Sequence, residues 1–299
     1  MPPLPLLAAG ALLLCAIGTF LFRRRASALL SSLDSLSKER GKGATTEKLI
    51  VEHDVVVLGA GCSACALVST LVKGGKRVLL LEGGEEDVYR HPAVVKSANW
   101  WGAAWGGDPT SHQYLTVPQK GMGGRRLLYP RGKGVGGTGN VNASIWSRGR
   151  REDYTSWPWA IEDIDASFAH VERTIGVQYI APAAPGDAML QMAEEAGIPR
   201  HTVTVPTWIT PGAEPGSFST SDKKSGDRIS GWARFIAPLL ADPDTRDLLT
   251  VVGGVTATQL VLQRQERQWA SQNRWCAAGV EVRCHSRAAR TLRECGASQ

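Results

Sequence analysis

The sequence predicts an α/β fold with a parallel sheet, and three observations near residue 60 predict it. Two short runs rich in Val and Leu, at residues 53–58 and 76–82, flank an apolar segment of helical length. A glycine-rich turn joins the first run to that segment. An acidic residue, Glu82, ends the second run. A strand, a glycine turn, a helix and a second strand in this order are typical of a dinucleotide-binding unit.

The composition is that of a globular protein. The chain has 299 residues, of which 43% are hydrophobic and 21% charged, which excludes a wholly disordered or collagen-like chain. The length suggests one or two domains. Lys and Arg number 34 against 28 Asp and Glu, a formal charge of +6, but the basic residues are scattered over the chain. We therefore expect no nucleic-acid partner.

The first 25 residues are expected to form a transmembrane signal anchor. Residues 4–22 carry no charge, and a helix of this length spans about 28 Å, close to the thickness of the hydrocarbon core. Arginines 23–25 follow the apolar run, whereas a cleaved signal peptide places positive charge before it. This order favours a cytoplasmic folded part. A mitochondrial or other organellar import peptide is the alternative, because no acid precedes Asp34.

Residues 26–48 are rich in Ser, Lys and Gly and are expected to form a linker, so that the folded part begins near residue 49. The first strand, HDVVVL at residues 53–58, is short and β-branched, as a buried parallel strand is. An apolar helix over residues 65–73 ends at two glycines, and KRVLLLE at residues 76–82 is the second strand.

The turn between strand and helix is expected to bind the pyrophosphate of a dinucleotide. Gly59 permits a tight turn, and Gly61 lets the backbone approach the phosphates. Ala64 stands where a third glycine is usual and is still small enough for the helix to pack on the strand. The helix N-terminus offers N–H groups to the anion, and Glu82 can bind ribose hydroxyls. A carboxylate there disfavours NADP and leaves NAD and FAD open.

Six cysteines in a chain of this size do not make a disulfide scaffold. Cys62 and Cys65 form a CxxC inside the glycine turn, and no second CxxC exists to complete a zinc site. We interpret the pair as small residues that pack at the start of the helix, with a redox pair as the alternative. No metal is expected.

A second glycine-rich segment, YPRGKGVGGTGNVN at residues 129–142, precedes ASIW at residues 143–146. Its backbone can form another nest for anionic groups, and Arg131 and Lys133 are available as counter-charges. The segment RGRREDY follows at residues 148–154, and then Ser156 and Trp157.

The order GxGxxA, LLLEGG, PRGKxxGGTxxxN and RGxxxDYxxW resembles the glucose–methanol–choline (GMC) oxidoreductase family of flavoproteins. Similar segments follow: a helix that closes in a Gly-Ile-Pro turn at residues 188–200, SGWARFIAPLL at 230–240, a returning strand at 249–261 and a further strand at 278–282. The resemblance thus covers about residues 50–285.

The resemblance implies FAD as the cofactor, with its pyrophosphate on the first helix and its ribose at Glu82. It implies an adenine contact at Val255, and flavin contacts within residues 131–142. Val141 occupies the place of the histidine to which some members link FAD, so we expect non-covalent FAD. The expected cofactor-binding residues are Gly59, Gly61, Ala64, Glu82, Gly83, Arg131, Gly136, Gly137, Thr138, Asn142 and Val255.

The implied architecture is a doubly wound, Rossmann-like FAD domain with a partial substrate domain. Residues 49–155 and 246–285 would form the FAD domain, and residues 156–245 the partial substrate or cap domain, with helices near 162–175 and 186–197. Residues 263–274 are expected to be an exposed insertion in a hairpin, and residues 286–299 a divergent tail.

The family oxidises primary or secondary alcohols by hydride transfer to the flavin, with a His as general base and a second His or Asn beside it. None of the six histidines of this chain lies in a setting that resembles this catalytic pair. The expected catalytic residues are therefore none, and the chain is expected to be inactive alone. Membrane attachment favours an apolar alcohol, with a quinone or oxygen as electron acceptor. The alternatives are a non-catalytic nucleotide-binding relic that binds a partner and, less favoured, an NAD-dependent dehydrogenase.

Overall fold

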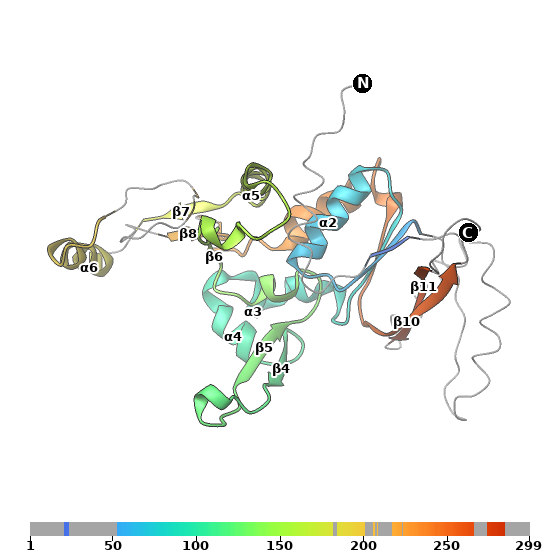
Figure 1. Cartoon of the computed structure of the whole chain (residues 1–299), viewed down its shortest axis with the longest axis horizontal. Helices are drawn as coiled ribbons and strands as arrows, with labels where there is room; N and C mark the ends of the chain where they lie inside the picture. The colour runs from blue at the N-terminus through green and yellow to red at the C-terminus, as the bar shows by residue number, and fades with distance from the viewer. Residues whose placement is uncertain are drawn as a thin grey trace, which may run out of the picture.

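The computed structural model describes residues 21–23, 53–181, 184–200, 206, 208, 217–222, 224–265 and 274–284 (Figure 1). Its central element is a four-stranded sheet with strand order β1-β2-β3-β9. The strands are β1 (Leu21–Arg23), β2 (Val55–Leu58), β3 (Val78–Leu81) and β9 (Leu249–Val252). β2, β3 and β9 run parallel, and β1 is antiparallel to β2. The α/β class is confirmed.

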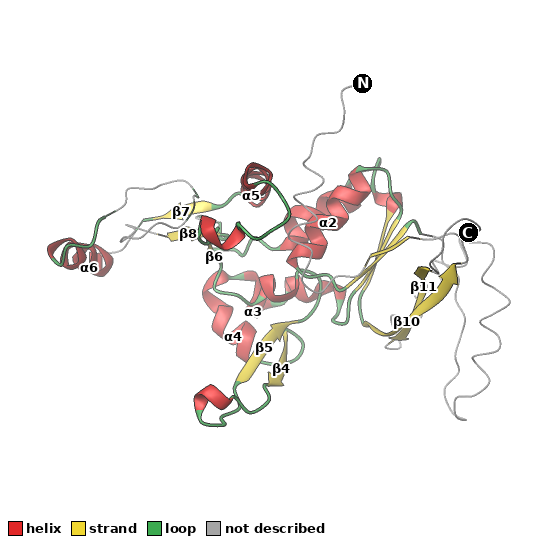
Figure 2. Ribbon diagram, viewed as in Figure 1, coloured by secondary structure: helices red, strands yellow, loops and turns green. Residues whose placement is uncertain are grey.

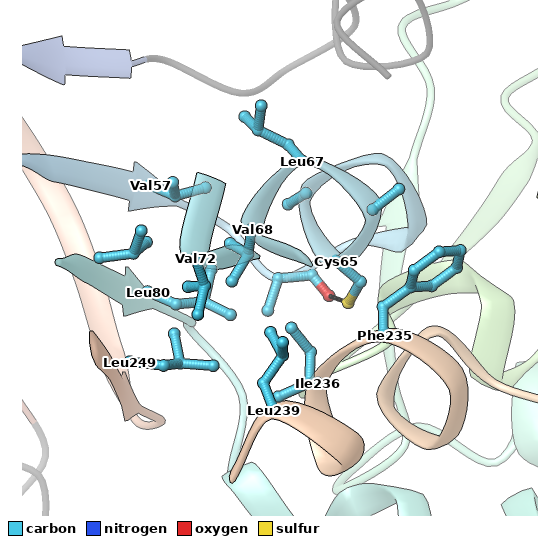
Figure 3. Close-up of a cluster of buried hydrophobic side chains, with 14 of the residues drawn as sticks. Val57, Cys65, Leu67, Val68, Val72, Leu80, Phe235, Ile236, Leu239 and Leu249 are labelled. Atoms are coloured by element: carbon cyan, nitrogen blue, oxygen red, sulfur yellow. Dashed lines mark hydrogen bonds between the residues drawn. The ribbon is translucent and has the colours of Figure 1, made fainter. Parts of the chain in front are cut away.

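One face of this sheet is covered by helices. The helix α2 (Cys62–Lys73) packs on it, together with the π-helical turn η7 (Trp232–Ile236) and the helix α7 (Ala237–Ala241). Figure 3 shows Val57 and Leu80 of the sheet facing Val68 and Val72 of α2. Each of these side chains is at most 1% exposed, and burial of one such aliphatic side chain stabilises the fold by about 1.5–3 kcal/mol.

The other face is covered by an antiparallel hairpin of β10 (Val255–Gln265) and β11 (Arg274–Cys284), visible beside the sheet in Figure 2. Val280 and Val282 of β11 pack against Leu79 and Leu81 of β3. The expectation of a doubly wound sheet, with helices on both faces, is therefore wrong for the described residues. The chain returns to this face as two strands with apolar residues in alternation, and these bury the sheet as a helix would.

The expected returning strand at residues 249–261 is in fact two strands. β9 ends at Val252 and joins the central sheet, whereas β10 starts at Val255 and belongs to the hairpin. Gly254 has φ +70°, a conformation that favours glycine, and its N–H donates to the carbonyl of Gly84. The turn at this glycine redirects the chain from one sheet to the other. Residues 266–273, most of the expected hairpin insertion, lie outside the described residues.

A second lobe contains a three-stranded sheet of order β6-β8-β7. Its strands are β6 (Ile145–Trp146), β7 (Gln178–Ile180) and β8 (Ser217–Ser219). The helices α5 (Ile161–Ile175) and α6 (Ala184–Glu195) confirm the two helices expected in this region. Ile164 and Phe168 of α5 pack against Trp146 and Tyr154.

A third group of elements lies between β3 and β6. It comprises η2 (Glu86–Arg90), α3 (Pro92–Val95), η3 (Ser97–Asn99), α4 (Trp100–Trp105), β4 (Ser111–Leu115), η4 (Lys120–Met122) and β5 (Leu128–Gly132). β4 and β5 form an antiparallel hairpin. The short helices η5 (Gly137–Asn140), η6 (Arg151–Tyr154) and η8 (Arg246–Leu248) complete the fold. Val88, Val94 and Val141 share a small buried cluster with two alanines of α4.

The described part of the chain contains no helix that is long and apolar enough to cross a membrane. Residues 1–20, which hold most of the expected anchor, lie outside the described residues, as do the linker at residues 26–48 and the tail at 286–299. Leu21 and Phe22, the last two residues of the expected span, belong to β1.

Candidate dinucleotide-binding site

The first glycine turn connects β2 to α2 as the sequence predicts. Gly59 has φ +81°, which side chains with a Cβ rarely adopt, and its N–H donates to the carbonyl of Leu81 at 2.7 Å. The turn is thereby fixed to the carboxyl end of β3. Gly61 precedes the helix, and a Cβ added to it would meet no atom within 4 Å. The space beside its backbone is open.

The N-terminus of α2 is free to attract an anion. Gly61 is its N-cap, no side chain caps it, and no acidic residue lies in its first turn. The positive end of the helix dipole therefore lies at Gly61, where the position of an added Cβ is open space. Ala64 is 1% exposed within the cluster between helix and sheet, so its small size serves packing, as expected.

The carboxylate of Glu82 joins three glycine-containing turns. Its Oε2 accepts a hydrogen bond from the N–H of Ala60 at 2.8 Å. Its Oε1 accepts from the N–H of Gly84 at 2.9 Å and from that of Gly134 at 3.2 Å. A carboxylate offers about four acceptor positions, so about one is left for a ribose hydroxyl. Glu82 is itself 9% exposed.

The turns that meet at Glu82 also fit into one another. A Cβ on Gly84 would overlap the backbone N of Gly134. The N–H of Gly136 donates to the carbonyl of Ala60 at 2.8 Å, and a Cβ on Gly137 would lie 2.8 Å from Cα of Gly61. The second glycine segment therefore lies directly on the first. Their proximity across the sequence is what a shared cofactor site requires.

Three other expected contacts occupy the same region. A Cβ added to Gly83 would lie 3.8 Å from Oγ1 of Thr256. Thr138 accepts a hydrogen bond from the N–H of Gly132 at 3.4 Å. Val255 is 2% exposed, and its N–H donates to the carbonyl of Glu82 at 2.8 Å. The structure thus places Val255 directly beside the carboxyl end of β3.

The CxxC cysteines contribute to the same packing. The thiol of Cys62 donates to the carbonyl of Gly136, and that of Cys65 to the carbonyl of Ala60, both at 3.5 Å. Cys65 is fully buried, and burial raises the pKa of its thiol well above the usual value. These contacts support the interpretation of the pair as small packing residues.

The expected counter-charges have other contacts. Lys133 forms an ion pair with Asp108, and the guanidinium of Arg131 lies 4.4 Å from the ring centroid of Tyr129. Arg131 is exposed on β5, whose register places it opposite His112. Spacing alone suggested that both cations face the glycine nest. The pairing of β5 with β4 determines the direction of Arg131, and the ion pair with Asp108 engages Lys133.

Two buried polar residues of the site escaped the sequence analysis. Arg228 donates through one Nη to Oδ1 of Asn142 at 2.7 Å and is 8% exposed. Asn140 is 0% exposed, and its Nδ2 donates to the carbonyl of Val135 while its buried Oδ1 has no hydrogen-bond partner. Asn140 lies between two highlighted positions of the glycine segment, but Arg228 is 86 residues from Asn142, and no local pattern links them.

These features fit a dinucleotide cofactor. The uncapped α2 N-terminus and the open space at Gly61 suit a pyrophosphate. Glu82 retains acceptor capacity for a ribose, and Asn142 is exposed at the far end of the second glycine segment. Among the described residues, no group of three or more His, Cys, Asp or Glu is arranged to hold a metal ion.

The described histidines have structural contacts. His53 shares a hydrogen bond with Oγ1 of Thr250, and His91 caps α3 by accepting from the N–H of Ala93. His112 stacks on Tyr114, and His170 lies on α5. His201 and His285 lie outside the described residues. His112 lies on β4 opposite Arg131 of β5.

Comparison with known proteins decides the family. The model of the GMC oxidoreductase family matches residues 53–296, which include every element of the site. The chain belongs to the GMC oxidoreductase family. The expected cofactor, FAD, is thereby confirmed at the level of the family.

Curated relatives match over part of their length. A dehydrogenase of Armillaria gallica is 37% identical over 133 residues, which are 40% of this chain and 21% of that protein. The mitochondrial choline dehydrogenase of Mus musculus is 38% identical over 111 residues, which are 36% of this chain and 19% of that protein. The GMC chain thus spans about a fifth of these relatives in the aligned regions.

A solved structure supports the fold. The pyridoxine 4-oxidase of Mesorbium loti superposes with a TM-score of 0.56 at 21% identity. The superposition covers 75% of this chain and 47% of that chain. At this identity the likeness concerns the fold alone.

Proposed function

We propose that this chain is the FAD-binding part of an oxidoreductase that acts on the CH–OH groups of alcohol donors. The observation that carries the proposal is the meeting of three glycine-containing turns at the carboxylate of Glu82, beside the uncapped N-terminus of α2. Family membership and relatives named as choline or alcohol dehydrogenases support this reaction class.

The residues of the chain have distinct tasks in this proposal. The N-terminus of α2 holds the pyrophosphate, and Glu82 accepts from a ribose hydroxyl. Gly136, Gly137 and Thr138 place their backbone beside the cofactor, with Asn142 at the flavin. When bound, FAD supplies the hydride acceptor for alcohol oxidation.

We propose non-covalent FAD. Val141 occupies the place at which some members carry a linking histidine, and its side chain is 3% exposed in the cluster with Val88 and Val94. A buried valine offers no nucleophilic atom to the flavin. Acid precipitation of the purified protein should release yellow flavin into the supernatant; colour retained in the pellet would contradict non-covalent binding.

We further propose that the chain alone does not turn over alcohols. The support is that His53 and His91 engage structural partners and that none of the six histidines has a sequence setting like the family's catalytic pair. The purified protein should show flavin absorption at about 450 nm, and anaerobic addition of choline or benzyl alcohol should leave that absorption unchanged. Bleaching would overturn the inactivity proposal, and air or a quinone would then be tested as the acceptor.

The alternative is a non-catalytic relic, and the lack of a catalytic base among the described residues is compatible with it. A relic without cofactor would show no flavin absorption band. An NAD-dependent dehydrogenase would bind NAD instead. Isothermal titration with FAD and with NAD separates these cases. We expect binding of FAD, because the second glycine segment at Gly136 and Gly137 favours it.

We also propose membrane attachment through residues 4–22, with the folded part on the cytoplasmic side. The support is the uncharged run followed by three arginines. The full chain should resist carbonate extraction, and deletion of residues 1–20 should release it. Processing of the N-terminus on import into mitochondria would favour the organellar alternative.

A further inference from the structure

Arg228 organises the far end of the second glycine segment. Its Nε donates to the carbonyl of Val94 at 3.1 Å. One Nη donates to the carbonyl of Gly139 at 3.2 Å, to Oδ1 of Asn142 at 2.7 Å and to Oγ of Ser144 at 2.9 Å. Three of these four acceptors belong to residues 139–144. A single buried side chain therefore fixes the last turn of the segment.

The burial of Arg228 is unusual because no carboxylate neutralises it. It is 8% exposed, and none of the ion pairs among the described residues includes it. Its second Nη is buried without a hydrogen-bond partner. Burial lowers the pKa of the guanidinium to about 10, so it remains a cation at neutral pH. Burial of a cation without a carboxylate partner carries a desolvation cost, which points to a role in the site.

The contacts of Asn142 determine which end of its carboxamide faces outward. Oδ1 of Asn142 accepts from two donors, the Nη of Arg228 and the N–H of Ser144 at 3.0 Å. Only an oxygen can accept both, so the carboxamide orientation follows from the hydrogen bonds. The Nδ2 group is then the free end of an exposed side chain. Asn142 is held as a hydrogen-bond donor.

The backbone next to Asn142 is strained and is held by the same network. Ser144 has φ +59°, in the left-handed region, and is 1% exposed. Its Oγ donates to Oγ of Ser97 at 3.2 Å, and Oγ of Ser221 donates to the same oxygen at 2.6 Å. Strained residues persist only where their surroundings fix them, and they gather at functional sites.

We propose that Arg228 is a positioning residue that locks the Asn142 carboxamide so that its Nδ2 donates to an acceptor atom of the flavin ring. This inference rests on the proposed FAD site. A fixed donor stabilises the negative charge that the flavin carries when reduced, and it therefore raises the flavin reduction potential. A purely structural arginine would have no such effect on the potential.

The test uses the full chain loaded with FAD and three substitutions. Arg228→Met removes the lock, and Arg228→Lys keeps the charge without the planar fork. Asn142→Asp keeps both hydrogen bonds from Arg228 and Ser144 but replaces the free donor by a carboxylate oxygen. The matched control is Arg148→Lys, which alters a partly buried arginine of the second lobe that is paired with Asp165 and Glu172.

We expect the Asn142→Asp protein to remain folded, to bind FAD about tenfold more weakly and to have a lower flavin midpoint potential than the wild type. Arg228→Lys should lower the potential to a smaller extent, and Arg148→Lys should leave it unchanged. If Asn142→Asp and Arg228→Lys both retain the wild-type potential, the proposal is wrong.

Amide hydrogen exchange of the cofactor-free chain gives a readout that does not need FAD. Arg228→Met should accelerate exchange over residues 139–144, while Asn142→Asp should not. Equal exchange in Arg228→Met and wild type would refute the claim that Arg228 fixes residues 139–144, even if FAD binds. A wild-type chain that shows this protection yet binds no FAD would refute the proposed function and, with it, the flavin contact.

Discussion

The N–H of Gly134 donates to the carboxylate of Glu82 at 3.2 Å, although 52 residues separate them in the chain. The same carboxylate accepts from Ala60 at the first glycine turn. Glu82 therefore holds the two glycine segments together, and in the proposed function the same carboxylate accepts from the cofactor.

Glu82→Gln should weaken both stability and FAD binding. If the amide oxygen accepts from Gly84 and Gly134, the amide NH2 faces the N–H of Ala60, donor against donor. The unpaired group should lower the free energy of unfolding by about 1–3 kcal/mol. Urea denaturation and FAD titration measure the two effects. The control Glu85→Gln changes an exposed neighbour and should alter neither the free energy of unfolding nor FAD affinity. An equal loss of stability and affinity in both variants would contradict the role of Glu82.

Gly61→Ala should separate cofactor binding from stability. An added Cβ meets no protein atom within 4 Å, so the free energy of unfolding of the cofactor-free chain should fall by less than about 1 kcal/mol, the difference between Gly and Ala at an N-cap. The same methyl group projects into the space assigned to the pyrophosphate. FAD affinity should fall about tenfold or more. Unchanged FAD affinity would show that the pyrophosphate lies elsewhere.

Gly84→Ala, in contrast to Gly61→Ala, should lower the stability of the cofactor-free chain. Its Cβ would overlap the backbone N of Gly134 and lie 2.9 Å from the Cα of that residue, so two backbone segments must separate. Overpacking of this kind costs about 1–3 kcal/mol of stability, visible as a lower urea midpoint without FAD. Gly197→Ala does not serve as a control, because Gly197 has φ +78°. Gly102→Ala, in open space on α4, does serve as one, and its urea midpoint should equal or exceed that of the wild type, because alanine favours a helix.

Glu172 of α5 should be essential for the second lobe. It accepts from Nε and one Nη of Arg148 at 2.7 and 2.6 Å and from Nε1 of Trp146 at 2.9 Å. Its side chain is 9% exposed, and that of Arg148 is 11% exposed. Glu172→Ala leaves the partly buried Arg148 with Asp165 alone and leaves Nε1 of Trp146 without its acceptor, and it should cost about 2–4 kcal/mol. The exposed Glu162 on the same helix supplies the control, Glu162→Ala, which should be close to neutral by thermal denaturation.

Stability should fall on mild acidification because of two histidines. Burial lowers the pKa of His112 and of His170 below 6.5, with Lys133 and Arg173 respectively adding to the effect. The unfolded chain therefore takes up protons first as pH drops below 6.5, and stability present above that pH is lost. The lowered pKa values of Asp54 and Asp222 act only below 3.8.

Urea denaturation between about pH 5 and pH 7 measures this dependence. The double substitution His112→Gln and His170→Gln should flatten it, while the wild type should lose stability toward the acid end. Identical slopes for the two proteins would mean that other groups titrate in this range.

The sequence predicted the local part of the site well. The turn at Gly59 and Gly61, the helix after it and the strand before Glu82 all depend on residues within about 30 positions of one another, and the helix and strand bounds agree closely with α2 and β3. Glycine at a left-handed position and a β-branched run before it are signals that a single segment contains.

The sequence analysis missed the features that depend on contacts between segments far apart in the chain. The contact between Arg228 and Asn142 joins segments 86 residues apart, and Lys133 pairs with Asp108, which lies 25 residues before it. The hairpin on the second face was missed for a similar reason. Apolar alternation in β10 and β11 reveals that these strands are buried, but not which surface buries them.

The neighbours β3 and β9 hydrogen-bond along their whole length, yet about 170 residues separate Val78 from its partner Leu249. During synthesis, at about 5–20 residues per second, the edge of β3 therefore waits on the order of ten seconds or more for its partner. Loops of this length close slowly and raise the contact order of the fold. The apolar edge of β3 thus stays unpaired in the nascent chain, open to aggregation, until Leu249 emerges.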